Sequence, residues 1–124
     1  MPRRLIHASR ALLVVTAAAI TWLSLVPRPP DVVGGSDKLA HLLAYATLGV
    51  LAGLSFAPRL TRISAAVAVV AGLAAYGVVV EGVQQLTGRE LDVADMIANA
   101  AGAAVGVAVA FLVRRAFGSR HRSR

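Results

Sequence analysis

The sequence predicts an all-α integral membrane protein of one domain, residues 1–124, with four transmembrane helices at about 11–27, 38–57, 62–86 and 93–114. Hydrophobic residues make up 57% of the chain, charged residues only 15%, and the mean hydropathy is +0.71. The long apolar runs are apolar on every side, which water would not tolerate but lipid does. The basic residues collect at the chain ends and in short loops, as in membrane proteins with a fixed orientation.

The first helix is expected from the run between Ala11 and Val26, which carries no charge and has Trp22 near its far end as an interfacial anchor. At a rise of about 1.5 Å per residue, this run almost spans a hydrocarbon layer of about 30 Å. The alternative is a cleaved signal peptide, because a basic start precedes the run and small residues occupy 17–19. The apolar run continues past those alanines, which favours a retained helix.

The second helix is expected to begin near Lys38. Prolines 27, 29 and 30 end the first helix, and Ser36 or Asp37 can cap the next one. Gly49 and Gly53 then follow at a small-xxx-small spacing, which allows another helix to approach closely.

The third and fourth helices are separated by a polar loop. Residues 63–80 form an uncharged run rich in alanine and valine, which ends at Glu81. The last run starts at Asp92 or Val93 and again carries two glycines at close-packing spacing, Gly102 and Gly106. We expect these glycines to serve helix packing, and the same glycines could serve a homodimer.

Orientation follows from the distribution of lysine and arginine. Most of the 13 basic residues lie at the N-terminus, in the turn at 58–62, at Arg114 and in the tail at 115–124. Because positive charge stays on the cytoplasmic side, we expect both termini inside and the tail to be a flexible cytoplasmic segment. This distribution also explains the net charge of +7 without a nucleic-acid partner, and none is expected.

This orientation brings three polar helix ends to the same, extracytoplasmic face. They are the start of the second helix, the end of the third and the start of the fourth. Ionisable groups at such depth usually pair, line a wet cavity or do chemistry. The expected polar cluster comprises Asp37, Lys38, His41, Tyr45, Glu81, Gln84, Arg89, Asp92, Asp95 and Asn99.

The order and spacing of these residues, with Gly102 behind them, resemble the signature of VanZ-like membrane proteins over about residues 36–110. The resemblance implies a small, multi-pass protein of the bacterial cell membrane. The family's name-giving member is linked to resistance to teicoplanin, a glycopeptide that acts on cell-wall precursors outside the cell. The resemblance supplies a place and a context, but it assigns no catalytic residue.

Several functions suit the cluster. Lys38, His41 and Arg89 could bind an anionic lipid or cell-envelope precursor headgroup, with carboxylates orienting them. His41 with Glu81 or Asp95 could catalyse hydrolysis or transfer at a membrane-surface ester. The cluster could instead only clamp the helices together.

Metal, transport and assembly roles have less support in the sequence. His41 with carboxylates could hold a divalent ion, but a single histidine without a metal-binding spacing gives no reason to expect a metal or another cofactor. A transporter needs polar residues across the midplane, whereas the inner two thirds of the third helix have none. An assembly protein would use the small-residue helix faces to bind another membrane protein.

Overall fold

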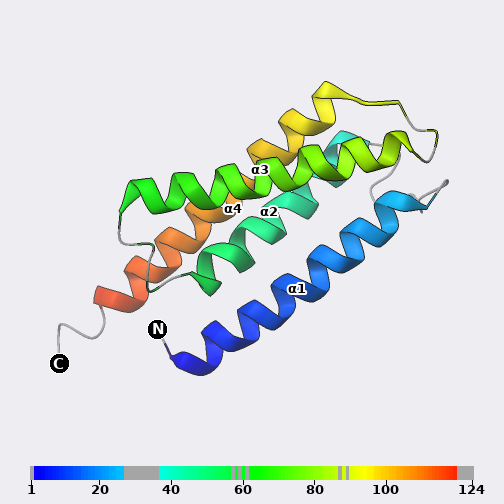
Figure 1. Cartoon of the computed structure of the whole chain (residues 1–124). Coiled ribbons are helices and arrows are strands. Elements are labelled where there is room, and N and C mark those ends of the chain that lie inside the picture. The colour runs from blue at the N-terminus through cyan, green and yellow to red at the C-terminus, as the bar shows by residue number, and fades with distance from the viewer. Residues whose placement is uncertain are drawn as a thin grey trace.

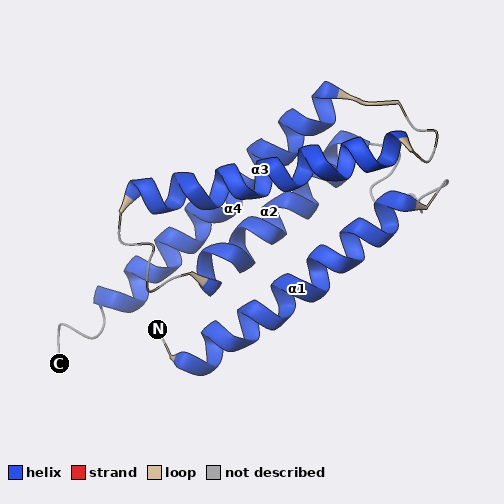
Figure 2. Ribbon diagram, in the orientation of Figure 1, coloured by secondary structure: helices blue, strands red, loops and turns tan. Residues whose placement is uncertain are grey.

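A computed structural model describes residues 2–26, 37–56, 58, 60, 62–86, 88 and 90–119. These residues form four α-helices, α1 (Arg3–Leu25), α2 (Asp37–Ser55), α3 (Ile63–Gln85) and α4 (Val93–Ser119), and they contain no strand. Figure 2 shows this all-helical architecture. Each helix is long and apolar enough to cross a membrane. The predicted fold class and the four expected helices are therefore confirmed.

The helices extend beyond the apolar runs in two places. α1 begins at Arg3, eight residues before the expected start, and α4 continues to Ser119, five residues past the expected end. Hydropathy marks only the part of a helix that lipid covers, whereas backbone hydrogen bonding continues into polar residues with good helix propensity. The prolines between α1 and α2, Ser36 and the tail from 120 onwards lie outside the described residues.

α2 and α4 form the core of the bundle, with the most extensive contact between any two helices. The four glycines at small-xxx-small spacing lie in this contact. A Cβ atom on Gly49 would lie 2.5 Å from the Ala103 carbonyl oxygen and 3.0 Å from the Cα of Gly106. Only residues without a side chain allow the two backbones to approach so closely.

α1 and α3 lie outside this pair (Figure 1). α1 packs mainly on α2, and α3 packs mainly on α4. A polar contact joins α1 to α3 directly, because the Tyr76 hydroxyl donates to the Ala17 carbonyl at 2.9 Å and lies 2.5 Å from the Thr21 hydroxyl. The outward faces carry exposed apolar side chains such as Val14, Trp22 and Val67, as expected for surfaces that face lipid.

The two ends of the bundle differ in character. α1 begins and α4 finishes at one end (Figure 1), where the Arg114 guanidinium donates a hydrogen bond to the Leu60 carbonyl of the α2–α3 connection. At the other end α1 and α3 finish and α2 and α4 begin (Figure 1). The antiparallel arrangement thus collects the polar ends of three helices at the end remote from the start of α1.

Candidate functional site

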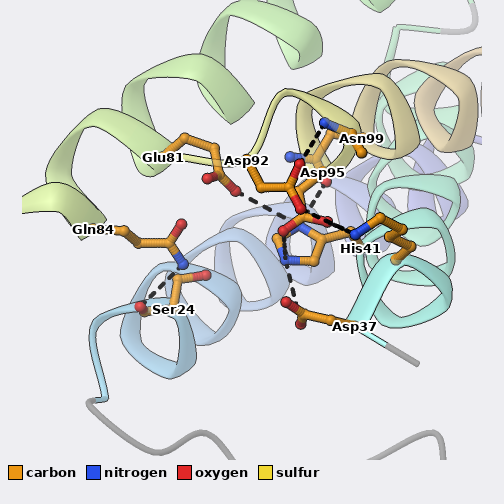
Figure 3. A network of polar contacts seen from close by, with 10 residues as sticks. Ser24, Asp37, His41, Glu81, Gln84, Asp92, Asp95 and Asn99 are labelled. Atoms are coloured by element: carbon orange, nitrogen blue, oxygen red, sulfur yellow. Dashed lines mark hydrogen bonds and ion pairs between the residues drawn. The ribbon is translucent and has the colours of Figure 1, made fainter. Parts of the chain in front are cut away.

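A polar cluster occupies this remote end of the bundle (Figure 3). α2 supplies residues from its first two turns, α3 from its last turns, and α4 from its N-cap and first two turns. Their side chains form one network of hydrogen bonds and ion pairs, which joins Asp37, Lys38, His41, Glu81, Asp92, Asp95 and Asn99. These seven are among the ten residues of the expected cluster, and from here on the name polar cluster refers to these seven alone.

His41 is the centre of the polar cluster, with a side chain that is only 14% exposed. Its Nδ1 lies 3.0 Å from the Asn99 Oδ1 and 3.8 Å from the Glu81 Oε1. Its Nε2 lies 3.6 Å from the Asp37 Oδ1 and 3.8 Å from the Asp95 Oδ2. One imidazole ring therefore connects all three helices, and both of its nitrogens face oxygen atoms (Figure 3).

Lys38 links α2 to the start of α4. Its Nζ lies 3.0 Å from the Asp92 Oδ2 and 3.7 Å from the Asp95 Oδ1. Asp92 also caps α4, since its Oδ1 accepts a hydrogen bond of 2.7 Å from the Ala94 amide. The Lys38 ammonium, and then the Ala94 amide, lower the pKa of the Asp92 carboxyl from its ordinary value of 3.8.

The polar cluster runs from the surface into the bundle. The side chains of Asp37, Lys38 and Asp92 are 55%, 59% and 45% exposed. Beneath them Glu81 and Asp95 are buried, with side-chain exposures of 4% and 6%. Burying such groups costs several kcal/mol each unless they gain charged or hydrogen-bonding partners. The cluster is thus a continuous polar path that starts at the exposed end and reaches buried carboxyl groups.

Two of the ten predicted residues make their described contacts elsewhere, and a third is not described. Gln84 is buried against α1, where its Nε2 donates to the Ser24 carbonyl at 3.1 Å. Tyr45 lies one turn deeper in α2 than His41, with its ring centroid 6.0 Å from that of Tyr76. Arg89 lies outside the described residues.

Sequence reasoning missed the contribution of α1 and one glycine of α3. Thr21 and Tyr76 are isolated polar residues in apolar runs, and this isolation could have predicted hydrogen-bond partners within the bundle. The Ser24 carbonyl gave no signal, because every residue has a backbone carbonyl. Gly77 makes room beside the cluster, since a Cβ atom there would lie 3.1 Å from the Asn99 Nδ2 and 3.2 Å from the Tyr45 hydroxyl.

The sequence that builds this site matches a known family. The family model described as VanZ/LLP1 matches residues 4–114, nearly the whole chain. The chain belongs to the VanZ/LLP1 family. The expected VanZ-like assignment is therefore confirmed, and with four membrane-length helices this VanZ/LLP1 chain is a multi-pass membrane protein. Searches of curated proteins and of solved structures found no match.

The chemistry of this VanZ/LLP1 site is dominated by acceptors. Within the polar cluster, four carboxyl groups and the Asn99 carbonyl oxygen surround one ammonium and one imidazole. Carboxylates concentrated in this way favour cations, ammonium groups and hydroxyl donors. Within the polar cluster, Lys38 is the exposed cation, and His41 is the group suited to proton transfer or metal ligation.

Proposed function

We propose that this VanZ-like protein binds the polar, phosphate-bearing headgroup of a lipid or lipid-linked cell-envelope precursor at the outer face of the bacterial cell membrane. Such binding would link the family to glycopeptide tolerance, because teicoplanin acts on cell-wall precursors at that face. The proposal concerns recognition and needs no covalent step.

The observation that supports it is the gradient of burial within the polar cluster. Lys38 presents an ammonium at the exposed end, and the helices α2 and α4 both begin there with their positive dipole ends. The buried groups below, Glu81, Asp95 and Asn99, hold the helix ends in a fixed arrangement around His41. A phosphate group at the exposed end would contact the Lys38 ammonium, while hydroxyl or ammonium groups of the same headgroup would contact the carboxylates of the polar cluster.

Orientation is part of the proposal and can be tested separately. We propose that the polar cluster faces outward and that the termini, with the basic tail, are cytoplasmic. The chain has no cysteine, so single cysteines at Glu90 and Arg62 report the two bundle ends without background. An impermeant thiol reagent on intact cells should label the Glu90 variant alone. Labelling of the Arg62 variant alone would reverse the orientation and refute an outer-face site.

Headgroup binding is tested with purified protein. Lys38→Met keeps the aliphatic stem and removes the ammonium. Loss of one charge-assisted hydrogen bond, worth about 1.5–3 kcal/mol, should lower retention of phosphate-bearing lipid by about tenfold or more. Retained lipids are identified and counted by mass spectrometry. Thr47→Ala is the matched control, because this exposed α2 hydroxyl donates to the Leu43 carbonyl of its own helix, outside the polar cluster.

A cellular readout completes the test. In a susceptible bacterial host, Lys38→Met should reduce teicoplanin tolerance while the protein remains inserted and folded, and Thr47→Ala should not. If Lys38→Met retains both lipid and tolerance at wild-type levels, headgroup binding by this cluster is refuted.

A second candidate function, a purely structural clamp, is favoured by the burial of Glu81, Asp95 and Asn99 around His41. A clamp predicts that His41→Gln lowers the free energy of unfolding and that lipid retention falls only in proportion to the unfolded fraction. Headgroup binding predicts loss of retention in the folded protein. Measuring both quantities on the same variant separates the two functions.

A further inference from the structure

The surroundings of His41 pose an electrostatic problem. Each ring nitrogen faces two oxygen atoms, from Asn99 and Glu81 at Nδ1 and from Asp37 and Asp95 at Nε2. A neutral imidazole has a single N–H, so one of its nitrogens would direct a lone pair at two oxygen acceptors. A proton on that nitrogen, a protonated carboxyl group or a bound metal ion would each resolve the conflict.

The distances indicate which of the two His41 ring nitrogens carries the lone pair. Nδ1 lies within hydrogen-bond distance of the Asn99 Oδ1, at 3.0 Å, so the Nδ1–H donates there. Nε2 lies 3.6 and 3.8 Å from its two carboxylate oxygens, too far for hydrogen bonds. Ligands of one tetrahedral ion, each about 2.0–2.2 Å from it, lie about 3.4 Å apart. The gaps at Nε2 are close to that separation.

We propose that Asp37, His41 and Asp95 bind a divalent transition-metal ion of the Zn²⁺ type through His41 Nε2 and one oxygen of each carboxylate. The three ligand atoms lie within 4.8 Å of one another, so small side-chain movements bring them onto one ion. Asn99 serves as the outer partner that holds the Nδ1–H and directs Nε2 to the metal, an arrangement typical of metal-binding histidines.

Asp95 provides an independent observation. The residue is only 4% exposed, and its Oδ1 accepts no hydrogen bond from the part of the chain that the structure describes. The Lys38 ammonium lies 3.7 Å from Oδ1, while Oδ2 faces His41. The Lys38 ammonium compensates Oδ1, and a metal ion would compensate Oδ2, so that both oxygens of this buried carboxylate would face positive charge.

The donor set selects the class of ion. One imidazole and two carboxylates suit Zn²⁺ or Mn²⁺ better than Mg²⁺ or Ca²⁺, which prefer oxygen ligands alone. Three protein ligands leave a coordination position open for water or another oxygen. Asp37 is 55% exposed, so this position is reached from the exposed end of the cluster. If the proposed headgroup function also holds, the ion would offset the carboxylates and accept a phosphate oxygen.

The test measures metal binding without any anionic headgroup. Protein with a histidine-free tag and a His7→Gln, His121→Gln background is placed in nanodiscs of phosphatidylcholine and titrated with Zn²⁺ in a competing chelator. We expect one ion per chain, with imidazole in the X-ray absorption spectrum. Asp37→Asn and His41→Gln should each weaken binding at least about tenfold, since even outer-shell changes cost about 10- to 100-fold.

Two controls make the result specific. Glu90→Gln removes an exposed carboxylate of the loop before α4, outside the polar cluster, and should leave the affinity for Zn²⁺ unchanged. Asp37 is largely exposed, so Asp37→Asn is expected to fold, and circular dichroism and unfolding checks verify this. ¹⁵N spectra of His41 then report whether Zn²⁺ replaces a proton at Nε2.

The proposal is overturned if the wild type binds no Zn²⁺, if Asp37→Asn and His41→Gln bind it as tightly as the wild type, or if His41 keeps protons on both nitrogens at saturating Zn²⁺. Lipid retention measured in chelator separates this outcome from the headgroup function. Retention that depends on Lys38 without bound metal would leave headgroup binding intact while the metal site fails. Zinc binding without lipid retention would support the metal site and refute headgroup binding.

Discussion

The close contact between α2 and α4 leads to a quantitative prediction for Gly106→Ala. A Cβ atom at Gly106 would lie 2.7 Å from the Val50 amide nitrogen and 2.9 Å from the Ala46 carbonyl carbon, and it would also meet the Ala46 carbonyl oxygen. Real Cβ atoms essentially never approach other atoms closer than 3.0 Å. All three neighbours belong to the α2 backbone, so no side-chain rotation can relieve the contact.

The magnitude follows from the movement required. Restoring an ordinary contact of 3.4 Å to the Val50 nitrogen alone separates the helices by about 0.7 Å. A gap of about 0.5–1 Å removes a quarter to a half of the dispersion attraction between facing atoms. This contact is the most extensive one in the bundle. We therefore expect Gly106→Ala to lower the free energy of unfolding by about 2–3 kcal/mol, the upper part of the range for overpacking.

A glycine on α3 provides the matched control. A Cβ atom on Gly72 would meet no heavy atom within 4 Å. Gly72→Ala should therefore be neutral or stabilise the protein by up to about 1 kcal/mol through helix propensity. Glycine to alanine is thus expected to destabilise the protein at Gly106 but not at Gly72.

The assay is reversible unfolding of the purified protein in mixed detergent micelles, followed by circular dichroism as the fraction of denaturing detergent rises. If Gly106→Ala unfolds within about 0.5 kcal/mol of the wild type, the range of ordinary surface substitutions, the described α2–α4 packing is wrong. An equal loss of stability in Gly72→Ala would show that helix propensity or insertion, and not helix contact, controls the result.

Two further predictions concern single polar contacts. Tyr76→Phe removes the hydrogen bond to the Ala17 carbonyl and should lower the free energy of unfolding by about 0.5–1.5 kcal/mol in the same assay, with Thr47→Ala unchanged; equal effects would contradict a role in joining α1 to α3. Lys38→Met should raise the pKa of Asp92 toward 3.8, measured by carbon NMR of the carboxyl. Because the pKa of Asp92 is lowered in the folded state, the stability that this contact contributes is present above about pH 4 and lost as the pH falls through the folded-state pKa. An Asp92 pKa that does not move would contradict the Lys38 contact.

The sequence by itself determined the four helices and their relative direction. Hydrocarbon leaves the backbone no partner outside its own segment, so four long apolar runs in a small chain must be helices. Short connections make neighbouring helices antiparallel, which brings the starts of α2 and α4 and the end of α3 to one end. Residues such as Lys38, His41 and Asp95 could therefore be assigned to one polar layer from their positions alone.

Only the tertiary structure decided how that layer is connected. Helix rotation, set by packing at Gly49 and Gly106, determines which side chains point inward, and sequence periodicity does not specify it between helices. This rotation brings Asp95 of α4 beside His41 of α2 and turns Gln84 toward α1 instead. The proposed metal ligands come from two helices, so Asp95 of α4 has no fixed sequence spacing from Asp37 and His41 of α2. Their proximity becomes visible only when the helices are placed against one another.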